Sequence, residues 1–151
     1  MYTPIPLTFP TPAGNGLLCA PFGTSKYSGP HERLLGKRVL IVEDEAMLAP
    51  ELELTFADEG AEVIGPALSL SHGVTLVEAT GEIDCAVLDV DLGGRDVFPI
   101  AHALEARGVP FVFHTAHAKA STLALLFPNS VTIPKPARPE DLVSRLAAIS
   151  R

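Results

Sequence analysis

Acidic side chains follow two short apolar runs of the chain. Glu43 and Asp44 come directly after the run Val-Leu-Ile-Val, and Asp89 and Asp91 lie at the end of the run Cys-Ala-Val-Leu. Carboxylates held close together repel one another, whereas a hard cation such as Mg2+ prefers carboxylate and carbonyl oxygens and also binds phosphate oxygens. A carboxylate can also act as a nucleophile in acyl-phosphate chemistry. These acids therefore predict a Mg2+ site at which Asp89 accepts a phosphoryl group.

Two further side chains at later apolar runs suit the same chemistry. Thr115 ends one run, and its hydroxyl can donate to a phosphate oxygen. Lys135 follows another, and its ammonium can pair with a second oxygen as a point charge. Each residue alone is a weak signal, because an acid at a strand end is usually just solvated and a Thr usually caps a turn. Their joint placement after four separate runs is much harder to attribute to chance.

The elements that must position these side chains alternate regularly along the chain. Continuous apolar runs are typical of strands buried on both faces, and amphipathic stretches between them are typical of helices. Strands are expected near residues 39–42, 63–64, 86–88, 109–113 and 131–133. Helices are expected near residues 48–59, 69–80, 96–108, 119–127 and 139–149. Because right-handed crossovers place helices on both faces, five β–α units predict a doubly wound α/β fold with a parallel sheet. Ligands bind at the carboxyl ends of such strands.

Several residues mark the expected helix ends. Ser69 or Ser71 can cap the second helix, and Asp96 can cap the third. Gly108 suits a helix end, and Pro139 suits a first helical position.

Composition separates an extension from a domain. The chain has 151 residues, of which 47% are hydrophobic, and its net charge is −7, so we expect one domain. Residues 1–36 hold six Pro and five Gly and predict a loose extension, whereas residues 37–151 form the domain. An acidic chain with no basic run is a poor direct partner for nucleic acid. No apolar run is long enough to span a membrane and no signal sequence is evident, so we expect a cytoplasmic location.

The motifs at the four runs are similar to those of the receiver domain of two-component response regulators. The resemblance covers about residues 37–151, and the four motifs occur in the family's order and spacing. It implies a CheY-like (βα)5 receiver fold of flavodoxin-like topology. The matching stretches are Val39-Leu40-Ile41-Val42-Glu43-Asp44-Glu45, Ala86-Val87-Leu88-Asp89-Val90-Asp91-Leu92, Phe113-His114-Thr115-Ala116 and Pro134-Lys135-Pro136.

The resemblance assigns a role to each site residue. Asp89 is expected to be the phosphoacceptor. Asp44 is expected to bind Mg2+ directly and Glu43 through water, with the backbone carbonyl of Asp91 completing the protein's ligands. Thr115 is expected to follow the phosphoryl group as the switch hydroxyl.

Lys135 is expected to contact the phosphoryl group from the other side, and the Lys135–Pro136 peptide is expected to be cis. The resemblance also places Asp91 and His117 at the mouth of the site, where we hypothesise that they set the lifetime of the phosphate.

The fourth run is similar to a narrower group of stand-alone, mostly alphaproteobacterial receivers that read Pro-Phe-x-Phe-Ala-Thr-Gly. This chain has His114 and Ala116 where that group has Ala and Gly. It also has Thr132 where many receivers carry an aromatic residue that swings inward with the switch hydroxyl. Any of three rings is a candidate substitute for that aromatic residue: Phe111, Phe113 and Phe127.

The function implied is that of a phosphorelay protein rather than of an enzyme acting on a separate substrate. A sensor histidine kinase, a histidine phosphotransfer protein or a small donor would phosphorylate Asp89. Output would pass to a protein partner through the face built from the fourth helix, fifth strand and fifth helix. We expect no output domain after Arg151, and the sequence leaves a homodimer open.

Three other classes remain as alternatives. A receiver-like docking module that takes no phosphate would keep the fold without needing Mg2+. A Toprim-like nucleic-acid enzyme would use Glu43 and the acids of the third run, but would leave Thr115 and Lys135 without a role. A phosphatase of the haloacid dehalogenase type would carry its nucleophilic Asp on the first strand, not on the third.

Overall fold

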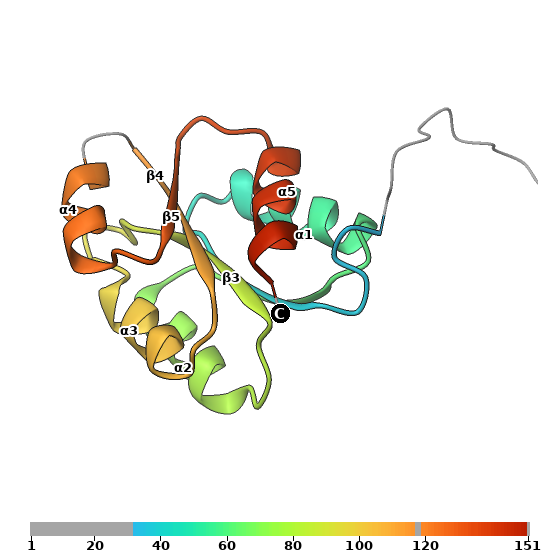
Figure 1. Cartoon of the computed structure of the whole chain (residues 1–151), viewed down its shortest axis with the longest axis horizontal. Helices are drawn as coiled ribbons and strands as arrows, with labels where there is room; N and C mark the ends of the chain where they lie inside the picture. The colour runs from blue at the N-terminus through green and yellow to red at the C-terminus, as the bar shows by residue number, and fades with distance from the viewer. Residues whose placement is uncertain (1–31, 117–118, 151) are drawn as a thin grey trace, which may run out of the picture.

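A five-stranded parallel sheet forms the centre of the molecule in the computed structural model, which describes residues 32–116 and 119–150 (Figure 1). The strand order is β2-β1-β3-β4-β5, which confirms the predicted doubly wound α/β fold. The expected extension lies outside the described residues up to His31. The strands are β1 (Arg38–Val42), β2 (Glu62–Ala67), β3 (Cys85–Asp89), β4 (Phe111–Thr115) and β5 (Val131–Pro134).

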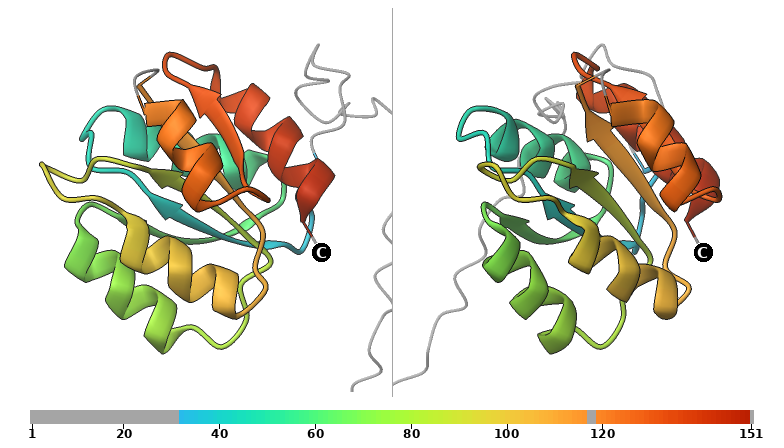
Figure 2. Two further views of the ribbon diagram at one scale, coloured as in Figure 1. Left: turned by 60° about the vertical axis from the view of Figure 1, so that its left-hand side comes forward. Right: turned by 90° about the vertical axis from the view of Figure 1, so that its left-hand side faces the viewer.

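Helices cover both faces of the sheet. The α2 and α3 helices lie side by side on one face, and α1 and α5 pack together on the other (Figure 2). The α4 helix inserts its buried Leu123 into the core on the α2–α3 side. No helix in the described part of the chain has both the length and the apolarity that a membrane span requires. The helices are α1 (Leu48–Asp58), α2 (Leu70–Ala79), α3 (Phe98–Ala106), α4 (Ala120–Leu126) and α5 (Pro139–Ile149).

Two of the three inner strands, β3 and β4, explain why the sequence shows apolar runs rather than alternation. Every residue of β3 and of β4 is buried, because each strand has helices on both of its faces. Polar residues within these strands are confined to their carboxyl ends: Asp89 in β3, and His114 and Thr115 in β4. The strands thus carry their polar groups to one edge of the sheet.

The predicted helix ends are mostly confirmed. Ser69 caps α2, since its hydroxyl accepts a hydrogen bond from the backbone N–H of His72 at 3.2 Å. Gly108 has a φ of 63° just after α3, a conformation that favours glycine. The expected cap at Asp96 is wrong: α3 begins at Phe98, and Asp96 instead forms an isolated bridge with Asp91 in the preceding loop.

Residues just before β1 belong to the packed structure, although their composition groups them with the extension. Leu34 is fully buried in the core between the sheet, α1 and α5. The Arg33 guanidinium pairs with the buried carboxylate of Glu59, with Nε 3.0 Å from Oε2, and its Nη1 donates to Ser144 Oγ at 2.7 Å. Packing therefore begins before Lys37, and Arg33 joins the end of α1 to α5.

Replacing Leu34 should reveal this packing. We expect Leu34→Ala to lower the free energy of unfolding by about 2–5 kcal/mol, because it leaves a cavity in the core. The neighbouring Leu35 is 62% exposed and provides the matched control, since Leu35→Ala should change stability by less than about 0.5 kcal/mol. Urea denaturation followed by circular dichroism measures both, and equal effects would contradict the assigned packing.

Candidate functional site

Four parallel strands bring the predicted site residues to one edge of the sheet. Val42 pairs with Leu88, so the residues that follow β1 lie beside the end of β3, and Asp89 pairs with His114, so the end of β3 lies beside that of β4. Thr115 in turn pairs with Pro134, which places Lys135 at the same edge. The cleft there is lined by Asp44, Glu45, Asp89, Asp91, Gly93, Gly94, Thr115, Ala116, Lys119 and Lys135.

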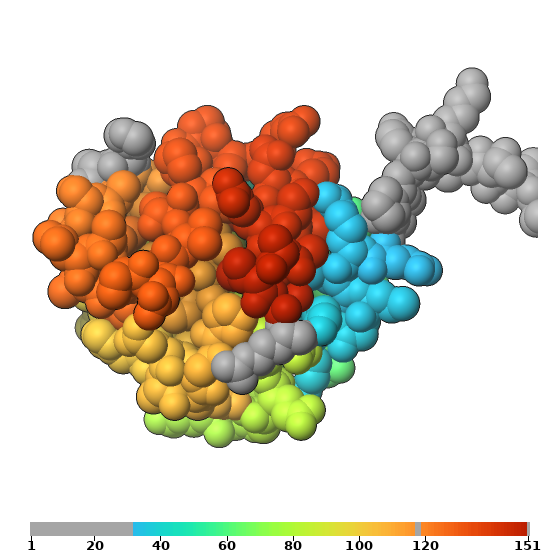
Figure 3. Space-filling view, viewed as in Figure 1, coloured from blue at the N-terminus to red at the C-terminus, as the bar shows by residue number. Residues whose placement is uncertain are grey.

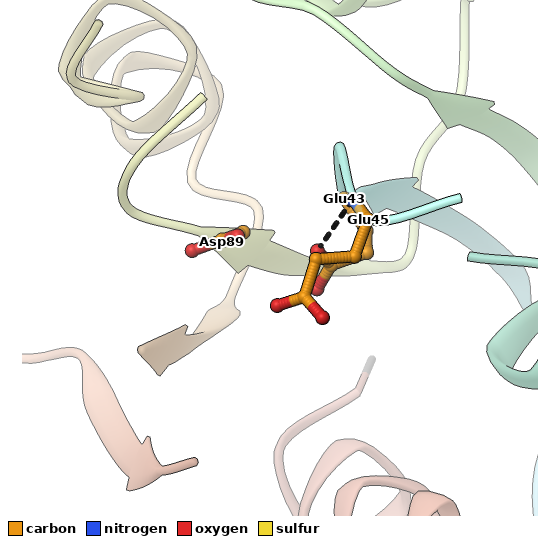
Figure 4. Close-up of side chains that lie close together, drawn as sticks. All are labelled: Glu43, Glu45 and Asp89. Carbon is orange, nitrogen blue, oxygen red and sulfur yellow. Dashed lines mark hydrogen bonds between the residues drawn. The ribbon is translucent and has the colours of Figure 1, made fainter. Parts of the chain in front are cut away.

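The ammonium group of Lys135 lies among three carboxylates. Its Nζ is 3.0 Å from Asp89 Oδ2, 2.8 Å from Glu45 Oε1 and 3.2 Å from Glu43 Oε2. Carboxylate oxygens of these three acids lie within 4.8 Å of one another. Figure 4 shows Asp89 at the end of β3, and Glu43 and Glu45 at the end of β1. The side chain of Lys135 thus offsets part of their mutual repulsion.

Burial and neighbouring charge disfavour ionisation of two of the acids. Loss of hydration, and after it the charge of Asp89, raises the pKa of the almost fully buried Glu43 to about 7, although Lys135 acts in the opposite direction. Asp44 is half-buried, and burial together with the charge of Asp89 raises its pKa as well. A site that makes its own carboxylates costly to ionise fits a divalent cation, whose charge would favour the ionised forms.

The carboxylates have the opposite effect on Lys135. Burial alone would lower its pKa, but hydrogen bonds to Glu45 and Asp89 and the charges around it hold the pKa above the usual value. The ammonium group is therefore charged throughout the physiological range. A permanent positive charge 3.0 Å from Asp89 Oδ2 can neutralise charge that develops on a group attached there.

The remaining predicted residues frame the cleft. Asp91 is exposed, its backbone N–H donates to Asp89 Oδ1 at 3.3 Å, and its own Oδ1 accepts from the Gly94 N–H at 2.7 Å. Thr115 is buried in the cleft wall. Its carbonyl accepts the backbone N–H of Lys135 at 2.8 Å, which ties the two positions together. The Lys135–Pro136 peptide is cis, as expected.

Sequence reasoning gave no role to Glu45 or to His114, which both lie at this edge. Glu45 was visible as the third acid after the first run, but nothing in its type showed that it would turn toward Lys135. His114 is buried behind Glu43, with Nδ1 4.0 Å from Oε2, and neither ring nitrogen has a hydrogen-bond partner among the described residues. Burial, aided by the charge of Lys135, lowers the pKa of His114 to about 4, so its imidazole is neutral.

His117, for which the sequence suggested a role in phosphate lifetime, lies outside the described residues. Thr132, which stands where the resemblance led us to expect an aromatic residue, pairs with Phe113 in the sheet.

Comparison with known proteins identifies the family. A family model described as the response regulator receiver domain matches residues 39–147, and the chain belongs to this family. Receiver domains of two-component systems interact with histidine kinases or phosphotransfer proteins and bind Mg2+ at an acidic pocket. The DNA-binding response regulator MtrA of Mycobacterium tuberculosis is 32% identical over 119 residues, covering 74% of this chain. The chain spans about half the length of the curated relatives it matches.

Solved structures agree on the fold. The receiver domain of HemR from Leptospira biflexa, in its non-phosphorylated form, is 26% identical, with a TM-score of 0.65 over 76% of this chain and 97% of that one. A response regulator receiver protein from Sinorhizobium medicae is 25% identical, with a TM-score of 0.63 over 74% of this chain and 94% of that one. In both comparisons the similarity covers almost the whole of the other protein's chain.

The raised pKa of Glu43 predicts a pH-dependent effect of Mg2+ on stability. Between the ordinary carboxyl pKa of 4.5 and about 7, the folded protein binds more protons than the unfolded chain, so the metal-free protein loses stability as pH rises. Binding of Mg2+ requires the ionised carboxylate, and Mg2+ at about 100 times its dissociation constant adds about 2.7 kcal/mol to the free energy of unfolding. We therefore expect Mg2+ to raise the melting temperature more at about pH 8 than at about pH 5.5.

Thermal unfolding with and without Mg2+ at the two pH values measures this difference. Glu43→Gln should remove most of the pH dependence, whereas Glu51→Gln, at an exposed position of α1, should leave it intact. An equal effect of Mg2+ at both pH values would contradict the assignment.

Proposed function

We propose that this chain is a phosphoacceptor response regulator, to which a histidine kinase or a histidine phosphotransfer protein transfers a phosphoryl group at Asp89. The observation that carries the proposal is the contact of Lys135 Nζ with Asp89 Oδ2 at 3.0 Å, within a cleft that also holds Asp44 and Thr115. A nucleophilic carboxylate, a fixed cation and a hydroxyl are the parts that such a transfer needs. The chain would catalyse only its own phosphorylation and dephosphorylation.

In the transfer, an oxygen of Asp89 forms a bond to phosphorus while the bond from phosphorus to the donor imidazole breaks, and the imidazole keeps the electron pair. Asp44, Asp89 and the carbonyl of Asp91 would hold Mg2+, with Glu43 acting through water. The metal would supply positive charge to the phosphoryl oxygens. Lys135 would neutralise a further oxygen, since its ammonium already lies against Asp89.

Once Asp89 carries the phosphoryl group, the Thr115 hydroxyl would move toward one of its oxygens. Thr115 ends β4 and precedes α4, so this movement would bias the α4–β5–α5 face toward a protein partner. On this face, part of which is visible in Figure 3, α4 exposes Leu125 and Leu126, with Leu125 84% exposed. Apolar side chains of this kind suit a protein contact.

Two finer assignments belong to the same proposal. The stretch Val109–Ala116 supports placing the chain near the group of receivers that read Pro-Phe-x-Phe-Ala-Thr-Gly, with His114 and Ala116 as its departures. The exposed carboxylate of Asp91 at the cleft supports a role in the rate at which water removes the phosphoryl group.

Intact-protein mass spectrometry tests the phosphoacceptor. After incubation with acetyl phosphate or a phosphorylated histidine donor, we expect one phosphoryl adduct that requires Mg2+ and is lost in Asp89→Asn. Asp58→Asn, an exposed acid at the end of α1, is the matched control and should retain it. Lys135→Ala should slow formation by about 100-fold or more, the effect typical of losing one preorganised donor. An adduct that persists in Asp89→Asn would refute the site, and no adduct with any donor would favour the docking module.

A further inference from the structure

Aromatic rings gather around Phe127, directly after α4. The Phe127 ring is 1% exposed and lies against four other rings from α3 and β4. The centroid distances from Phe127 are 4.8 Å to His102, 5.3 Å to Phe113, 5.6 Å to Phe98 and 6.0 Å to Phe111. The Phe127 side chain, at the end of α4, thus connects β4 with α3.

The cluster includes Phe113, which lies two residues before Thr115 in β4. Alternate residues of a strand face the same side, so Phe113 and Thr115 share the face of β4 toward α3 and α4. Phe113 pairs with Thr132 in β5, the position at which the resemblance to receivers led us to expect an aromatic residue. A threonine offers no ring at this point, whereas Phe127 brings a ring to Phe113 from the α4 side.

The backbone at Phe127 is held firmly at both sides. Its N–H donates to the carbonyl of Leu123 within α4 at 2.8 Å. Its carbonyl accepts the backbone N–H of Ser130 at 3.0 Å and the Ser130 hydroxyl at 2.8 Å. Phe127 is therefore joined to α4 through its backbone and to the cluster through its ring, and the first residue of α4, Ala120, follows Thr115 by only five positions. A displacement of Thr115 that moved α4 would therefore also shift the Phe127 ring against the other rings of the cluster.

We propose that Phe127 is the positioning residue that carries the movement of Thr115 to α4 and to α3, in the role that an aromatic residue at position 132 has in other receivers. Phe111 and Phe113 suit this role less well, because both belong to β4 and are held in the sheet. The signal would then reach the surface at His102 of α3, whose ring lies on Phe127 and whose side chain is 62% exposed. The inference rests on the proposed phosphorylation of Asp89.

The test follows the His102 ring by NMR in the full chain, before and after addition of beryllofluoride with Mg2+, which occupies an acceptor aspartate as a phosphoryl group does. His102→Gln assigns the signal. In the wild type we expect the His102 signals and the α4 amides to shift. In Phe127→Leu we expect the His102 shift to be lost, while intact mass with acetyl phosphate shows that Asp89 still accepts the group. Phe111→Leu removes another ring of the cluster and should retain the His102 response.

Each outcome decides a different point. A wild type that accepts no group at Asp89 would refute the proposed function, and the inference with it. Acceptance without a response at His102, an undiminished response in Phe127→Leu, or an equal loss in Phe111→Leu would overturn the inference alone. If Phe127→Leu does not fold, Phe127→Met takes its place, because the flexible methionine side chain fills irregular space in a core.

Discussion

The contacts between the Lys135 ammonium and the carboxylates of Glu43, Glu45 and Asp89 govern the rest of this site. Three acids whose oxygens approach within 4.8 Å repel one another, and two of the three are buried, where that repulsion is weakly screened. One cation does not restore ordinary ionisation, since burial and then the charge of Asp89 keep the pKa of Glu43 at about 7. A divalent cation would favour the ionised carboxylates that this environment disfavours.

The parallel sheet is what allows these charges to meet. The acids come from the ends of β1 and β3, and the lysine follows β5. The β4 strand lies between β3 and β5 in the sheet. Residues separated by 46 and 92 positions in the chain thereby contact one another without a local loop to hold them. Packing of the strands between the two hydrophobic cores fixes their register. Burial of apolar side chains in these cores also offsets the free-energy cost of holding like charges close together.

The sequence was most informative where a polar residue directly follows or ends an apolar run. Apolar runs ending in Asp89, Thr115 or Lys135 predicted both the strands and the edge at which they end. The direction of Glu45 could not be read, because a side chain just after a strand can turn either to solvent or to the site. The pairing of Arg33 with Glu59 spans 26 residues and has no local pattern. Asp96 is a good capping type, but the bridge between Asp91 and Asp96 moves the start of the helix beyond its reach.

The attachment formed by Arg33 and Leu34 has a consequence for chimeric proteins. The family match begins at Val39, so a graft that exchanged receivers at the matched residues would leave both side chains behind. The buried Glu59 carboxylate would then face the new sequence without the guanidinium that now contacts it, and the core between α1 and α5 would lack a leucine. A transplanted receiver that begins at Glu32 keeps its own core, whereas one that begins at Val39 depends on what its host supplies.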